Sequence, residues 1–286
     1  MAKQKKIFKK QSQHKPGLEY KMIPHPVFNT NEPGCNKLLN YKCIITGGDS
    51  GIGRAVAIAF AKEGADIAIL YLKKEEKDAR FTAFIIENNY KRECLLVPTD
   101  ISKESYCHKA LKKIHKQFKR IDVLVNNAGV HYEATDFSKA TNEHLEETFY
   151  TNFFSMYWIT KTTLRYMEKG SCIINTASVT AYRGSGHLID YSASKGAVVS
   201  FTRSLSANLA DKGIRVNGVA PGPVWTPLIA SSYSSAKISA FGTNNPMKRP
   251  AQPVEIAPAY VFLASSGASY ITGQIIHVNG GEIVNG

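Results

Sequence analysis

Three side chains near the middle of this 286-residue chain could together move a proton. Tyr191 and Lys195 are four residues apart, so on a helix they share one face. Ser178 lies upstream of them, just after the apolar run CIINTA. A free tyrosine has a pKa of about 10 and is a poor acid or base near neutrality, and a nearby lysine cation should lower that pKa. The serine hydroxyl would hold a substrate oxygen against the phenol, so the trio could serve an alcohol or a carbonyl.

Proton chemistry of this kind needs a hydride carrier, and a second motif offers a site for one. The stretch 46–53 reads TGGDSGIG and follows the apolar run YKCIIT. A glycine-rich turn between a strand and a helix lets the backbone approach a pyrophosphate, and the helix N-terminus favours that anion. The residues that we assign to the cofactor here are Gly47, Asp49, Ser50, Gly51, Ile52 and Gly53.

Further candidate cofactor contacts follow the later predicted strands, at the edge of the sheet where such ligands bind. Asp100 could accept a hydrogen bond from an adenine amino group, with Ile101 beside it. The stretch NNAG would pass the adenine ribose, through Asn126, Ala128 and Gly129. The stretch PGPVWTP would meet the nicotinamide carboxamide with its backbone and the phosphates with Thr226, and it adds Pro221, Gly222 and Val224.

From Lys42 onward, short apolar strands alternate with longer helices. Seven strands are predicted around 41–46, 65–71, 93–100, 121–129, 171–178, 213–222 and 273–281. Helices are predicted over 51–63, 75–89, 102–118, 142–168, 190–211 and 253–265. This alternation predicts an α/β fold, a doubly wound parallel sheet with helices on both faces. No repeat or linker interrupts it, so we expect residues 37–286 to form a single domain.

Two segments of the chain do not follow this alternation of strands and helices. Residues 1–36 are basic and polar and contain four prolines, so we expect an N-terminal extension without its own core, disordered at its start. The later part, PGLEYKMIPHPVF, is apolar enough to lie along a surface. Residues 226–250 have no regular pattern and are expected to fold over the substrate as a lid.

Composition favours a globular protein of the cytoplasm. The chain is 43% hydrophobic and 21% charged, and its apolar runs are too short to span a membrane. The five cysteines form no CxxC pair and are interpreted as reduced thiols. No cluster has the spacing of metal ligands, so no metal is expected. The net charge of +13 is spread over the tail and several helices, which argues against a nucleic-acid site.

Taken in order, TGGDSGIG, NNAG, Ser178, YSASK and PGPVWTP resemble the classical short-chain dehydrogenase/reductase family over about residues 37–286. The resemblance implies a Rossmann-type seven-stranded parallel sheet and a homotetramer built as a dimer of dimers. It also implies that Asn152 completes an Asn–Ser–Tyr–Lys tetrad and holds a water in a proton relay. Tyr191 would be the general acid/base, Ser178 would polarise the substrate oxygen, and Lys195 would bind the nicotinamide ribose and lower the Tyr191 pKa.

The N-terminal extension indicates a particular subgroup of this family. With PGLEYKMIPHPVF before the core, the chain is similar to a bacterial subgroup named general stress proteins or glucose/ribitol dehydrogenase-like oxidoreductases. The expected function is NAD(P)-dependent hydride transfer between nicotinamide and a secondary alcohol or carbonyl. The second strand ends in Tyr71 and Leu72, where NAD-preferring members usually carry an acid. Two lysines follow and favour NADP slightly, but Glu75 or Glu76 could reach the ribose, so NAD stays open.

Two alternatives compete with this function. One is a 3-oxoacyl thioester reductase, whose basic surface would dock an acidic carrier. The other is a non-catalytic NAD(P)-binding regulatory protein, which the presence of all four tetrad residues disfavours. At the edge of the predicted substrate pocket, three residues are candidates to face the substrate: His131, Tyr132 and His187. Trp225 is expected to pack under the lid.

Overall fold

The computed structural model describes residues 6–282, and its centre is one seven-stranded sheet. The strands lie in the order β3-β2-β1-β4-β5-β6-β7, and every neighbouring pair is parallel. Their bounds are β1 Lys42–Thr46, β2 Asp66–Tyr71, β3 Cys94–Pro98, β4 Val123–Asn126, β5 Cys172–Thr176, β6 Arg215–Pro221 and β7 Ile275–Val278. The prediction of a Rossmann-type parallel sheet with seven strands is confirmed.

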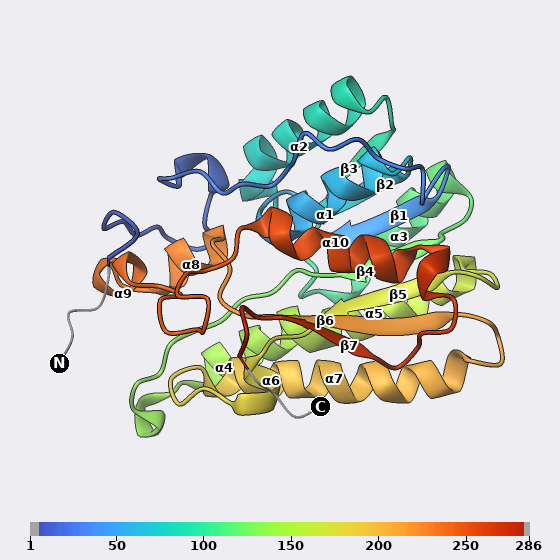
Figure 1. The fold of residues 1–286 in the computed structure, drawn as a ribbon. Coiled ribbons are helices and arrows are strands. Elements are labelled where there is room, and N and C mark those ends of the chain that lie inside the picture. The colour runs from blue at the N-terminus through green and yellow to red at the C-terminus, as the bar shows by residue number, and fades with distance from the viewer. Residues whose placement is uncertain (1–5, 283–286) are drawn as a thin grey trace.

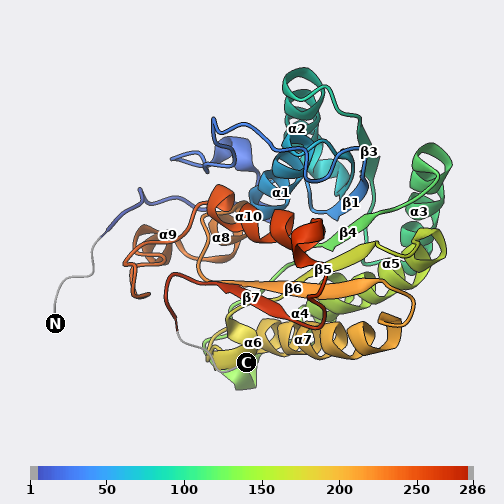
Figure 2. The same cartoon turned by 45° about the vertical axis from the view of Figure 1, so that its right-hand side comes forward.

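Helices cover both faces of the sheet, because its strands are apolar on both sides (Figures 1 and 2). Cys43 and Ile45 of β1 pack with α1, α2 and α10, whereas Ile44 packs with α3 and α5 on the opposite face. The helices are α1 Gly51–Lys62, α2 Glu76–Asn89, α3 Glu104–Phe118, α4 Asn142–Phe149, α5 Ser155–Thr163, α6 Thr180–Arg183, α7 Ile189–Leu209, α8 Pro227–Ser232, α9 Ser235–Ser239 and α10 Pro253–Ala264.

One predicted helix has a different form in the structure. The stretch expected to run as a single helix over 142–168 is divided into α4, a π-helical turn over Tyr150–Phe154, and α5, and it ends in a short 3-10 turn. A π turn inserts one extra residue into the helix, and such turns are frequent at functional sites. Here the turn contains Asn152, so the irregularity falls on a predicted site residue.

The sheet order reverses between β1 and β4, because β2 lies on one side of β1 and β4 on the other. In open parallel sheets, ligands bind beyond the carboxyl ends of the strands at such a switch point. The glycine-rich loop after β1 and the NNAG stretch after β4 meet there. The short helices α8 and α9, which belong to the predicted lid, lie at the same end of the molecule (Figure 1).

The N-terminal extension packs against this end, so the expectation of disorder is wrong for the described residues from Lys6 onward. The amide of Ile7 donates to the carbonyl of Ser239 at 2.9 Å. The Phe8 ring stacks on Trp225 with 3.8 Å between centroids, and the Trp225 indole N–H donates to the Pro24 carbonyl at 2.9 Å.

Two side chains explain why the extension is ordered. Met22 of the extension and Trp225 of the stretch after β6 are both fully buried in one apolar cluster. Separating the extension from the rest of the chain would expose both side chains to water. Residues 1–5 of the predicted extension and 283–286 of the predicted domain lie outside the described residues.

Candidate active site

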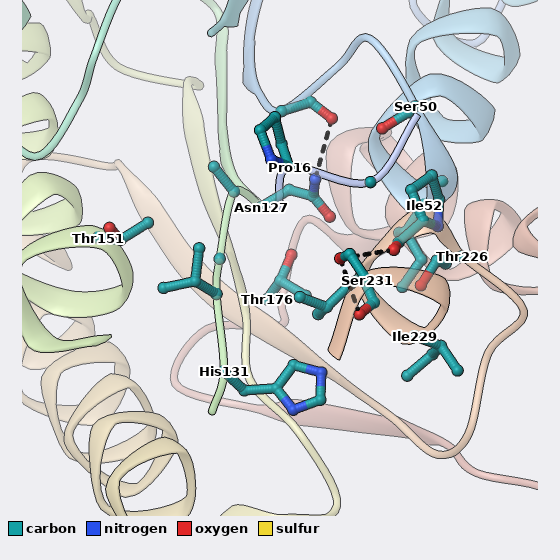
Figure 3. A pocket seen from close by; sticks show the side chains of 18 of the residues that line it. Pro16, Ser50, Ile52, Asn127, His131, Thr151, Thr176, Thr226, Ile229 and Ser231 are labelled. Carbon is teal, nitrogen blue, oxygen red and sulfur yellow. Dashed lines mark hydrogen bonds between the residues drawn. The ribbon is translucent and has the colours of Figure 1, made fainter. Parts of the chain in front are cut away.

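A cavity of about 1940 Å³ opens at the carboxyl edge of the sheet (Figure 3). Its wall is formed by the loops after β1, β4, β5 and β6, by the end of β2, and by α8. The extension also contributes to the wall through Lys15, Pro16 and Gly17. These three residues were missed at the sequence level, since nothing in a proline-containing polar tail indicates where it docks.

The glycine loop has the backbone shape that a bound pyrophosphate requires. Gly47 and Gly51 have positive φ angles of 64° and 54°, which favour glycine. A Cβ on Gly53 would lie 1.9 Å from the Gly47 carbonyl oxygen, so only glycine lets α1 approach the loop. Asp49, Ser50 and Ile52 line the cavity with the first two glycines, whereas Gly53 packs behind them. The loop therefore fits a dinucleotide cofactor.

The structure separates the two asparagines of the NNAG stretch after β4. Asn126 does not line the cavity, because its amide donates to Thr160 and Asn175 inside the core. Asn127 lines it instead, and its side chain donates to the Thr46 carbonyl at 3.1 Å. Alternate side chains of a strand share one face, so Asn126 lies on the same face as Leu124, which α5 covers.

The other two residues of this stretch, Ala128 and Gly129, line the cavity as expected. So do Pro221, Gly222 and Val224 after β6. Thr226 also lines it and lies against the glycine loop, since a Cβ on Gly51 would be 3.2 Å from the Thr226 Cβ.

The adenosine end of the cavity is rich in lysines. Tyr71, Leu72, Asp100 and Ile101 line it as predicted, and one Asp100 carboxylate oxygen already accepts from the Ser102 amide and hydroxyl. The lysines that line the cavity near these residues are Lys73, Lys74, Lys103, Lys109 and Lys113. The last three come from the loop before α3 and from α3 itself, so the sequence did not indicate that they line one cavity with Lys73 and Lys74.

The catalytic candidates meet on one wall. Ser178, Tyr191 and Lys195 all line the cavity. The Lys195 Nζ donates to the Thr176 carbonyl at 2.7 Å and lies 5.6 Å from the centroid of the Tyr191 ring. The Ser178 hydroxyl accepts from the Thr180 amide and hydroxyl at 3.2 and 3.0 Å. The helix α7 brings the phenol and the ammonium to one face, as the four-residue spacing predicted.

The electrostatics of this trio differ from the expectation. Burial raises the pKa of Tyr191 to about 12, although its hydrogen bond with Ser178 opposes the shift. The expected lowering by Lys195 is wrong for this state of the protein, because the Lys195 ammonium is directed to the Thr176 carbonyl. Burial also lowers the pKa of Lys195 to about 8. Tyr191 is therefore a protonated phenol at neutral pH.

Asn152 lies behind the cavity wall and not in it. Its amide oxygen accepts from the Val130 amide at 2.8 Å, and its amide nitrogen donates to the Val130 carbonyl and to the Ser194 hydroxyl at 2.9 and 3.1 Å. These contacts fix the chain next to Gly129 and the helix that carries Tyr191. The described contacts thus indicate a positioning role for Asn152.

The remaining candidates divide between the cavity and its surroundings. His131 and His187 line the cavity, and His131 is almost completely buried. Tyr132 does not line it, because its ring stacks on His144. Trp225 packs against the extension. Within residues 6–282, no group of three or more His, Cys, Asp or Glu side chains could hold a metal ion, and no helix is both long and apolar enough to cross a membrane.

Comparisons with known proteins agree with this geometry. A family model described as Enoyl-(Acyl carrier protein) reductase matches residues 47–282. The chain is 51% identical over 288 residues to the uncharacterized oxidoreductase YhxC of Bacillus subtilis, with all of both chains covered. It is 48% identical to NADPH-dependent aldehyde reductase 1 of Arabidopsis thaliana, covering 96% of this chain and 98% of that protein. It is 46% identical to the glucose and ribitol dehydrogenase of Daucus carota, with 95% of each covered.

Solved structures of dehydrogenases and reductases also align with this chain. A short chain dehydrogenase from Burkholderia cenocepacia in complex with NADP aligns with a TM-score of 0.80 at 27% identity, over 86% of this chain and 98% of that one. A 3-ketoacyl-(acyl-carrier-protein) reductase from Brucella melitensis complexed with NADH aligns with a TM-score of 0.76 at 32% identity, over 85% and 98%. The resemblance inferred from the motifs is confirmed, and the chain belongs to the short-chain dehydrogenase/reductase family of oxidoreductases.

Proposed function

We propose that this protein is an NADPH-dependent reductase of small polar carbonyl compounds, and that it also oxidises the corresponding secondary alcohols. The observation that carries this proposal is that Ser178, Tyr191 and Lys195 line the same cavity as the glycine loop. A proton donor and the candidate binding site of a hydride donor therefore share one cavity.

Each of these residues has its own role in the proposed reduction. A nicotinamide dinucleotide bound along the glycine loop would supply the hydride. The Ser178 hydroxyl, held by Thr180, polarises the substrate oxygen. The Tyr191 phenol donates the proton to that oxygen, and its raised pKa means that the proton is present at neutral pH. The Lys195 ammonium is positioned by the Thr176 carbonyl to meet the nicotinamide ribose.

NADPH is favoured over NADH by the charges at the adenosine end. Five lysines line that end, and lysine is a good point-charge partner for a 2′-phosphate. Asp49 and Glu75 also line the cavity. Burial raises the pKa of Glu75 to about 8, so this carboxyl group is largely neutral at pH 7, whereas Asp49, with a pKa raised to about 6, keeps most of its charge. The names of the Arabidopsis relative and the Burkholderia complex agree with this choice.

We also propose a homotetramer that works in the cytoplasm. Apolar surface is exposed along α4, the π turn and α5, by Leu145, Tyr150, Phe154 and Tyr157. A second copy of the chain would cover this surface.

The cysteines support the proposed location in the cytoplasm. All five are free thiols, and four of them are buried, as expected in a reducing compartment.

The replacement Tyr191→Phe tests the reaction, because it removes the proton donor and little else. We expect it to lower kcat for reduction by at least about 100-fold, the scale of general acid catalysis, while NADPH binding measured by fluorescence stays within about twofold. Tyr166→Phe is the matched control, since Tyr166 stacks on His115 away from the cavity. Unchanged turnover in Tyr191→Phe would exclude this mechanism.

A further inference from the structure

A buried histidine without a hydrogen-bond partner lies beside the catalytic tyrosine. His131 is 2% exposed, and neither of its ring nitrogens hydrogen-bonds to any residue of the described chain. Its ring centroid is 5.3 Å from that of Tyr191 and 5.4 Å from that of Tyr233. Figure 3 shows the ring extending from the loop after β4 toward Ile229 of α8. A buried polar group without a hydrogen-bond partner destabilises the folded protein, so its presence in a cavity wall needs an explanation.

The surroundings keep this imidazole neutral. Burial lowers the pKa of His131 to about 3, and the nearby Lys15 and His187 lower it further. The backbone of Leu228 approaches the ring but does not complete a hydrogen bond. A neutral imidazole presents one N–H donor and one lone-pair acceptor, and its tautomer can adapt to the group that it meets.

The charges around the ring narrow the class of ligand. The Lys15 ammonium lies 2.5 Å from the His131 carbonyl and 3.0 Å from the centroid of the Tyr132 ring, so the extension holds His131 in place through its backbone. This cation disfavours a substrate ammonium, and it is already engaged by the carbonyl and the ring. The neutral imidazole offers no charge to a carboxylate. A hydroxyl group, which both donates and accepts, matches the ring.

We propose that His131 is a specificity-determining residue that binds a hydroxyl on the carbon next to the reacting carbonyl, so that the enzyme selects 2-hydroxycarbonyl compounds and vicinal diols. The inference rests on the proposed function, which places the reacting oxygen at the Tyr191 phenol. A hydroxyl on the adjacent carbon then falls between Tyr191 and His131, whose rings are neighbours. Tyr233 and α8 cover this corner, so the hydrogen bond would form away from water.

A matched pair of ketones tests the proposal. Acetoin and butanone differ only by one hydroxyl on the carbon next to the carbonyl. We expect the wild-type enzyme to favour acetoin in kcat/KM by at least about tenfold, because a site built to bind a substrate hydroxyl rejects the analogue that lacks it. In His131→Leu this preference should fall to about unity, mainly through a higher KM for acetoin, while butanone is reduced as before.

Two further variants separate recognition from damage to the fold. His131→Gln keeps a donor and an acceptor and should restore part of the preference for acetoin. His108→Leu removes an exposed histidine of α3 that does not line the cavity and should leave the preference unchanged. An equal acetoin preference in wild type and His131→Leu would overturn the proposal.

A binding measurement distinguishes failure of this inference from failure of the proposed reaction. Calorimetry of butane-2,3-diol and butan-2-ol with the Tyr191→Phe enzyme and NADP⁺ needs no turnover. Tighter diol binding that is lost when His131→Leu is added supports the inference, even if neither ketone is ever reduced and the proposed reaction fails. Equal binding of the diol and the monool would contradict it, even in an active reductase.

Discussion

At the scale of single residues, the site depends on how burial sets the protonation of Tyr191. A phenol with a pKa near 12 is almost fully protonated at neutral pH, so only a small fraction of it is the phenolate that alcohol oxidation needs. That fraction grows about tenfold for each pH unit below the pKa. The two directions of the reaction should therefore respond differently to pH.

We expect alcohol oxidation with NADP⁺ to accelerate as the pH rises from about 6 to about 7, while carbonyl reduction stays nearly constant over the same range. The range ends below the pKa of Lys195, which burial lowers to about 8, because Lys195 loses half of its charge at that pH. Initial rates measured in both directions with one substrate pair check this. An oxidation rate that does not change with pH would show that phenolate formation does not limit the reaction.

At the scale of elements, the extension is joined to the cofactor loop by buried charges. Glu19 and Asp78 both pair with Arg54 of α1, and all three side chains are 2% exposed. The Glu19 carboxylate also accepts from the Gly51 amide at 2.5 Å, at the N-terminus of the helix that follows the glycine loop. Residues far apart in the sequence thereby hold the first turn of α1.

Removal of one partner from a buried ion pair leaves an uncompensated charge. We expect Glu19→Ala to lower the free energy of unfolding by about 3 kcal/mol, because Arg54 loses one of its two buried ion-pair partners and keeps Asp78. Urea unfolding followed by circular dichroism measures the change. Lys21→Ala, an exposed neighbour on the same 3-10 turn, is the control and should have little effect. Equal stability of the two variants would show that the extension is not anchored by this pair.

At the scale of the whole molecule, the exposed aromatic side chains on the π turn and α5 predict assembly. Tyr150, Phe154 and Tyr157 are each about 40% exposed. The Phe154 ring contacts the ring of Trp158, and the Tyr157 ring contacts that of Phe201. A single copy of the chain leaves this surface in water, which is unfavourable for a contiguous apolar patch.

Light scattering after size-exclusion chromatography should give about four times the 31.5 kDa mass of the chain for the wild type and a smaller species for Phe154→Glu. Phe84→Glu places the same charge on α2, where the replaced ring is also exposed, and should not change the mass. A wild-type monomer, or identical masses for both variants, would contradict the proposed assembly.

The sequence by itself determined the fold and most of the site, because these features depend on short segments. Apolar strands alternating with helices specify a parallel sheet, and a glycine loop between a strand and a helix specifies an anion site. The four-residue spacing of Tyr191 and Lys195 needs only one helix to bring them together. For the same reason the motifs, taken in order, were sufficient to indicate the family.

Only the tertiary structure decided the features that depend on contacts between distant segments. It turned the Asn126 side chain into the core and Asn127 to the cavity, placed Lys15 and Pro16 of the extension in the wall, and brought the lysines of α3 into the same cavity as Lys73 and Lys74. It also raised the pKa of Tyr191, where the sequence argument predicted a lower value. Spacing along the chain reports which groups are near in sequence, whereas desolvation and side-chain direction are set by everything that packs around them.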